Sequence, residues 1–252
     1  MVESVDRAYS YVTNAASLLL VAQAGAHLSI PSRKFVMLDR NPVPELLEWP
    51  APTREGVVDA YFSADVETDG PIPGPYSMLS FALVYAGSFD GRRFARPTSY
   101  SETFYREIKP ISNEFEVEAL QVNGLDRNRL IIEGAAPADA MSEAARWVKE
   151  IAGAAKPVLV AYPLSFDWTW LYWYFIRFSR EGSPFGYSRC FDLKTALSIK
   201  GAVPIAASGR SRLTEALRSS RQHTHHALDD AIEQAEIFAN VFQWEGTRGG
   251  AG

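Results

Sequence analysis

The stretch AYFSADVET, residues 60–68, decides the fold class of this 252-residue chain. Apolar side chains occupy the even positions from 60 to 66, and this alternation with a period of two predicts a β-strand. Asp65 and Glu67 therefore leave the same face of the strand, about 7 Å apart along the backbone. Such a pair also occurs on solvated strand faces, but the apolar strand around it favours a site for hard divalent cations, which prefer oxygen ligands.

Two more strands follow this one. Residues 78–86 are a continuous apolar run, and residues 103–108 alternate again; turn-forming segments at 70–75 and 87–97 separate the three. Consecutive strands joined by loops predict an antiparallel meander.

Helical patterns dominate the rest of the chain, with two short strands among them. Asn113 is a candidate helix cap before a helix that ends at Gly124, and Ser165 is a candidate cap for an aromatic helix through Phe178. Further helices are predicted at 138–151, 193–199, 213–217 and from 226 or 227 to 242, and strands at 158–161 and 190–191. The order predicts an α/β fold in which a mixed sheet is flanked by helices.

Two further groups of residues are candidates for chemistry. Asp167 opens the aromatic helix, where a carboxylate also suits the helix dipole without any function. His225 and Asp230 are five residues apart, so they converge only if His225 lies just before the last helix. Three of the four histidines crowd this point, which favours function; a histidine-only zinc site is the competing interpretation, but the neighbouring acids favour magnesium or manganese.

Composition narrows the class of protein. The net charge of −5 argues against a protein that coats nucleic acid by electrostatics alone. Residues 177–221, however, contain nine basic and only three acidic residues. This excess of positive charge indicates either a solvated basic surface or a rim that binds phosphates. A single cysteine, Cys190, excludes intrachain disulfides, and the longest apolar run is too short to span a membrane. We expect a soluble, cytoplasmic protein.

The order of these motifs resembles that of the DEDDh (DnaQ-like) 3′–5′ exonucleases of the ribonuclease H-like superfamily. The resemblance rests on Asp65-x-Glu67-Thr68, then Phe166-Asp167, then His225-x-Ala227-x-x-Asp230, and it covers residues 57–244. It implies a five-stranded mixed sheet whose first three strands are antiparallel. It also implies cleavage of single-stranded DNA or RNA, or of overhangs, from the 3′ end.

The resemblance also implies a role for each residue. Asp65, Glu67 and Asp230 would hold the first of two Mg²⁺ or Mn²⁺ ions, and Asp65 and Asp167 would hold the second. His225 would be the general base, while Thr68 and Phe166 would contact the terminal nucleotide. The expected domains are an N-terminal extension of unknown role (residues 1–52), an exonuclease domain (53–245) and a disordered tail (246–252).

This sequence departs from the family pattern in two places. Tyr162-Pro163 stands where the family usually has His-Asn, which affects substrate handling rather than the metal ligands. The segment between Asp192 and His225 is also atypical, and its basic loop from Lys200 to Arg212 is a candidate substrate element.

Several alternatives stay open at this point. A catalytically idle nucleic-acid-binding module of the same fold is the main alternative, and a phosphatase acting on free nucleotides, which would need a closed pocket, is another. The sequence does not separate DNA from RNA, and it leaves a homodimer open.

Overall fold

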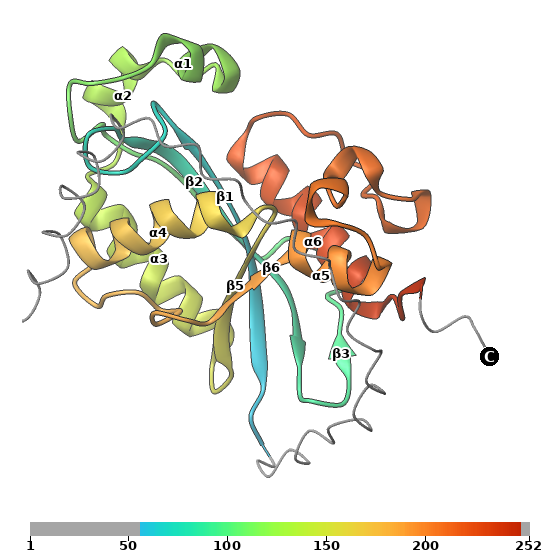
Figure 1. Cartoon of the computed structure of the whole chain (residues 1–252). Helices are drawn as coiled ribbons and strands as arrows, with labels where there is room; N and C mark the ends of the chain where they lie inside the picture. Colours follow the sequence, from blue (N-terminus) through green and yellow to red (C-terminus); the bar gives the residue numbers. More distant parts are fainter. Residues whose placement is uncertain (1–55, 248–252) are drawn as a thin grey trace, which may run out of the picture. The chain divides into compact units, whose positions relative to one another are not determined.

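The computed structural model describes residues 56–247, so the expected extension at residues 1–52 lies outside the described part. Its centre is a six-stranded mixed sheet with the order β3-β2-β1-β5-β6, in which β4 also pairs with β2 (Figure 1). The strands are β1 (Asp59–Thr68), β2 (Met78–Phe89), β3 (Phe94–Ala95), β4 (Thr103–Glu107), β5 (Lys156–Ala161) and β6 (Cys190–Asp192). β2 is antiparallel to β1 and β4, whereas β5 is parallel to β1. The predicted ribonuclease H-like sheet is confirmed, and the two-residue β3 is an addition to it.

The described part of the chain also contains six α-helices and three short 3-10 helices. The α-helices are α1 (Val117–Asn123), α2 (Arg127–Glu133), α3 (Pro137–Ala152), α4 (Leu164–Phe178), α5 (Leu193–Gly201) and α6 (Ala227–Gln243). The 3-10 helices are η1 (Ile205–Ala207), η2 (Arg210–Arg212) and η3 (Glu215–Leu217). The helix predicted at 213–217 is therefore only a 3-10 turn, and α2 was not predicted.

Both predicted helix caps are wrong. The residue before α1 is Glu116 rather than Asn113, because the Glu116 backbone N–H donates to Asp69 O at 2.8 Å and keeps that residue extended. α4 begins at Leu164, one residue before Ser165. The predicted end at Gly124 is confirmed by its left-handed backbone, with φ 66°.

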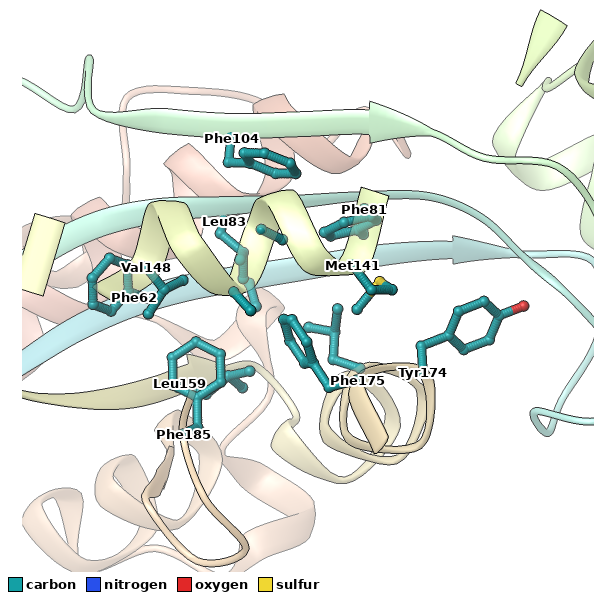
Figure 2. Close-up of a cluster of buried hydrophobic side chains, with 14 of the residues drawn as sticks. Phe62, Phe81, Leu83, Phe104, Met141, Val148, Leu159, Tyr174, Phe175 and Phe185 are labelled. Carbon is teal, nitrogen blue, oxygen red and sulfur yellow. The ribbon is translucent and has the colours of Figure 1, made fainter. Parts of the chain in front are cut away.

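The sheet buries a hydrophobic cluster on each face. On one face, β1 side chains such as Phe62 pack against α3 and α4, where Met141, Val148 and Phe175 are fully buried (Figure 2). On the other face, Tyr61 packs with α6 through Phe238 and Phe242, at ring-centroid distances of 4.9 and 5.5 Å. A strand covered on both faces explains why β1 is apolar almost throughout.

The face covered by α6 is also the face of Asp65 and Glu67. Tyr61 precedes them at the same two-residue period, so all three side chains leave β1 on one side. α6 therefore faces the strand end where the acidic pair lies. None of the helices in residues 56–247 is both long and apolar enough to cross a membrane.

Candidate active site

Three predicted carboxylates meet at the end of β1. Asp65 and Glu67 from β1 and Asp230 from the first turn of α6 each place one oxygen within 4.8 Å of the others. Asp230 is fully buried and Glu67 is 9% exposed. The structure thus brings together Asp65 and Asp230, which are 165 positions apart in the sequence. Three carboxylate oxygens this close to one another are the kind of ligands that hard divalent cations prefer.

Asp167 approaches the same strand from α4. Its Oδ1 accepts a hydrogen bond from the Val66 backbone N–H at 3.2 Å, and the side chain is only 5% exposed. Phe166, beside it, is 40% exposed, whereas Thr68 is buried with its hydroxyl bonded to Gly70 O at 2.8 Å. The structure therefore places all four predicted carboxylates at one strand end.

His225 lies just before α6, as its convergence with Asp230 required. Its φ of 59° is unusual for a residue other than glycine. This conformation is held by Asp230, whose Oδ2 accepts the His225 N–H at 2.8 Å and whose Oδ1 accepts the Thr224 N–H at 2.8 Å. The backbone thus turns around one buried carboxylate and directs the His225 ring to the site.

The crowded carboxylates resist ionisation in the metal-free protein. Burial raises the pKa of Asp65 well above its ordinary value, and the charges of Asp167, Glu67 and Asp230 raise it further. Burial, with the charges of Asp230 and Asp167, raises the pKa of Glu67 to about 8. Burial also raises the pKa of Asp167, although backbone N–H groups and Arg210 oppose that shift. A bound cation would relieve this repulsion, so the donor set fits divalent metal ions.

A solvent-open cavity of 550 Å³ surrounds the site. Asp65, Glu67 and Asp167 line it together with the sequence-predicted Thr68, Phe166 and His225. Asp230 lies directly behind the lining, since it is fully buried. The cavity is open rather than closed, which suits the end of a polymer better than a free nucleotide.

Three further residues contact this site: Gln234, which the sequence did not single out, His223 from the predicted histidine cluster, and Arg210 from the predicted substrate loop. Gln234 is fully buried on α6, and its Nε2 donates to Asp65 Oδ1 at 3.0 Å. His223 Nδ1 lies 3.0 Å from Asp230 Oδ2, and Arg210 lines the cavity from η2. Gln234 could have been found from its spacing, because four residues after Asp230 it shares that residue's face of a helix. Arg210 was predicted only as a member of the candidate substrate loop at residues 200–212, and nothing in the sequence distinguished it from the other basic residues there.

Asp192, the last residue of β6, joins two parts of the site. Its Oδ1 accepts the backbone N–H of Leu164 at the start of α4, and its Oδ2 accepts that of Thr195 in α5, both at 3.0 Å. One carboxylate therefore caps two helices. α4 carries Asp167, and α5 leads into the segment that carries Arg210.

A mixed sheet with this strand order, with four carboxylates and a histidine at the end of its first strand, is the arrangement expected of a DEDDh-type nuclease. Comparison with known proteins agrees. The family model of the 3′–5′ exoribonuclease Rv2179c-like domain matches residues 63–242. The 3′–5′ DNA exonuclease Cap18 of Escherichia coli is 32% identical over 181 residues, which are 71% of this chain and 90% of that protein.

Solved structures show the same fold at low sequence identity. The nuclease domain of 3′hExo, a DEDDh family member bound to rAMP, has a TM-score of 0.55 at 12% identity and covers 74% of this chain and 92% of its own. A 3′-exonuclease solved for its recognition of the histone mRNA stem-loop has a TM-score of 0.53, also at 12% identity, over 74% of this chain and 81% of that one.

The chain belongs to the family of Rv2179c-like 3′–5′ exoribonuclease domains. The prediction of a DEDDh-type 3′–5′ exonuclease is thereby confirmed. The cluster of Asp65, Glu67 and Asp230 is a donor set that fits a divalent metal ion.

Proposed function

We propose that this exonuclease removes nucleotides from the 3′ ends of single-stranded DNA or RNA, or of overhangs, with two Mg²⁺ or Mn²⁺ ions and a histidine general base. The observation that carries the proposal is the meeting of Asp65, Glu67, Asp167 and Asp230 at one end of β1, beside His225. The family description names RNA and the E. coli relative acts on DNA, so both sugars belong to the proposal.

The four carboxylates are the proposed metal ligands. Asp65, Glu67 and Asp230 would hold one ion, and Asp65 and Asp167 would hold the other. When bound, two such ions neutralise charge on the phosphodiester and align the attacking and leaving oxygens. The carboxylates themselves are held in place by protein hydrogen bonds, from Gln234 to Asp65 and from the Val66 N–H to Asp167.

His225 is the proposed general base, which takes a proton from the attacking water. Its ring lines the cavity and is exposed, and no described side chain or backbone group hydrogen-bonds to that ring. A ring nitrogen without a protein partner is available to accept a proton from a water molecule in the cavity. His223 is less suited, because its Nδ1 already lies 3.0 Å from Asp230.

Thr68 and Phe166 are the proposed contacts of the terminal nucleotide. Phe166 presents an exposed ring to the cavity, as a base-stacking surface requires. The Thr68 backbone is fixed from the other side, since Asn123 Nδ2 donates to Thr68 O at 3.0 Å. Asn123 itself lines the cavity from α1.

The remaining proposals concern the whole chain. We propose an exonuclease domain at residues 53–245, preceded by an extension and followed by a tail; Thr247 in that tail donates to Lys200 O at 3.3 Å. A cytoplasmic location is supported by the single cysteine.

The proposed homodimer is supported by three half-exposed aromatic side chains on α4, namely Trp168, Tyr172 and Trp173. Light scattering, which measures the mass of the particle in solution, would test the oligomeric state.

A digestion panel tests the proposed function. Single- and double-stranded DNA and RNA, labelled at the 5′ end, would be incubated with Mg²⁺, Mn²⁺ or EDTA. Stepwise shortening of the single strands with either metal, and none in EDTA, is the expected result. Resistance of every substrate in the presence of metal would instead identify an idle nucleic-acid-binding module.

A further inference from the structure

Arg210 is the one Lys or Arg among the described residues that line the acidic cavity. It lies in η2, within the atypical segment between Asp192 and His225. It is linked to the carboxylates through His223, whose Nδ1 lies 3.1 Å from Arg210 Nη1 and 3.0 Å from Asp230 Oδ2. A positively charged side chain cannot be a metal ligand, so the position of Arg210 beside the proposed metal site needs a different explanation.

Three neighbours fix the Arg210 guanidinium. Its Nε lies 3.3 Å from Glu233 Oε2, its Nη1 lies 3.1 Å from His223 Nδ1, and its Cζ lies 5.3 Å from the centre of the Tyr162 ring. Nε and Nη2 are buried and have no hydrogen-bond partner among residues 56–247, since the 3.3 Å contact with Glu233 is an ion pair without hydrogen-bond geometry. Buried donors are almost always paired, so an unpaired N–H pair beside an active site indicates a missing acceptor.

Tyr162 explains how Arg210 reaches the site. Its ring lies at the end of β5 on the α6 side of the sheet, and its hydroxyl donates to Ser208 O at 2.6 Å. Ser208 is two residues before Arg210, so this bond holds the segment next to the cavity. The two departures from the family pattern, Tyr162 and the atypical segment, are therefore parts of one arrangement.

We propose that Arg210 binds a phosphate oxygen of the nucleic-acid substrate and that Tyr162 positions it. A guanidinium offers donors in a fixed plane that matches a phosphate, and Nη2 is free to donate. The charges of the site agree with this role. In the proposed metal-bound state, two divalent ions would balance the four carboxylates, and Arg210 would balance Glu233. The bound phosphodiester would then bring an anionic acceptor that needs hydrogen-bond donors. The inference rests on the proposed function and adds a substrate contact to it.

The test measures kcat and KM on a single-stranded oligonucleotide with Mg²⁺. Arg210→Gln should lower kcat/KM by about 10- to 100-fold, as expected for the loss of a hydrogen bond to a charged group. Arg210→Lys should fall in between, because lysine keeps the charge without the fork. Tyr162→Phe should change kcat/KM in the same direction and add little to Arg210→Gln.

A second measurement separates a phosphate contact from a structural role. In an Asp65→Asn background, which prevents cleavage, the dissociation constant of the oligonucleotide is measured at several salt concentrations. Arg210→Gln should reduce the slope of log K against log salt by about 0.7, the value for one phosphate contact on a single strand. Arg146→Gln is the control, since Arg146 is an exposed arginine on α3 that does not line the cavity.

Three outcomes would overturn the inference: an unchanged kcat/KM in Arg210→Gln, an unchanged salt slope, or full recovery in Arg210→Gln/Glu233→Gln. The last would mean that Arg210 only neutralises Glu233. Each is distinct from failure of the proposed function, in which the unmodified protein itself would not shorten the oligonucleotide.

Discussion

Gln234 Nε2 donates a 3.0 Å hydrogen bond to Asp65 Oδ1 and a 3.2 Å bond to Ala64 O. One buried amide thus ties α6 to the strand that carries the acidic pair. It also fixes the rotamer of Asp65, so Gln234 supports a proposed metal ligand without being one.

Substitution of Gln234 should therefore weaken metal binding. Gln234→Ala is expected to lower the affinity for Mn²⁺ by about 10- to 100-fold, the usual cost of losing an outer-shell partner. Calorimetric titration of the metal-free protein measures this directly. Gln243→Ala, at the exposed end of the same helix, is the control. Equal Mn²⁺ affinity in the two variants would contradict the supporting role.

Asp65→Asn and Asp230→Asn should both abolish activity but differ in stability. Asp65→Asn relieves repulsion among buried carboxylates, so the melting temperature should stay the same or rise. Asp230→Asn weakens the hydrogen bonds from the Thr224 and His225 N–H groups, each worth about 1.5–3 kcal/mol when the acceptor is charged. Its melting temperature should fall by several degrees. Calorimetry and the oligonucleotide assay check both; activity in either variant would contradict the assignment.

His225→Ala should slow the reaction and leave metal binding intact. Loss of a general base costs about 10²- to 10⁴-fold in rate, and the His225 ring contacts none of the described carboxylates by a hydrogen bond. His223→Ala is the comparison, because that ring lies on the same loop. A larger rate loss in His223→Ala than in His225→Ala would indicate that His223, not His225, is the general base.

The metal-free protein should become less stable as pH rises through neutrality. The folded-state pKa of Glu67 is about 8, above its ordinary value of 4.5, so the folded protein binds this proton more tightly than the unfolded chain. The stability linked to Glu67 is fully present below pH 4.5 and is lost as pH rises through 8. Each kcal/mol lost lowers the melting temperature by about 2–4 °C in a domain of this size.

Melting in EDTA between pH 5.5 and 8.5 checks this expectation. The Glu67→Gln variant should show a flatter dependence on pH, because it cannot ionise at that position. Added Mg²⁺ should reverse the loss, since metal binding requires the ionised carboxylates. A melting temperature that rises with pH in EDTA would contradict the sign.

The sequence predicted the parts of the site that depend on local periodicity. Alternation in β1 placed Asp65 and Glu67 on one face, and the spacing to Asp230 placed His225 just before α6. Arg210 was predicted only as part of the basic loop at residues 200–212, because it lies in a 3-10 turn of an irregular segment where no periodicity marks which side chain faces the site. Ser165 was wrongly taken as a cap because the α4 N-terminus is capped by Asp192, 28 residues away. Local sequence does not contain contacts of that kind.

The double cap by Asp192 has a consequence for evolution and engineering. One carboxylate holds the start of α4, which carries Asp167, and the start of α5, which leads to the segment of Arg210. The two sides of the site are therefore energetically coupled. Substitutions in α4 and in the segment after α5 should therefore have non-additive effects on the free energy of unfolding, even where the substituted side chains do not touch. A substrate loop grafted into this segment would alter the carboxylate side as well, unless the Asp192 cap is kept.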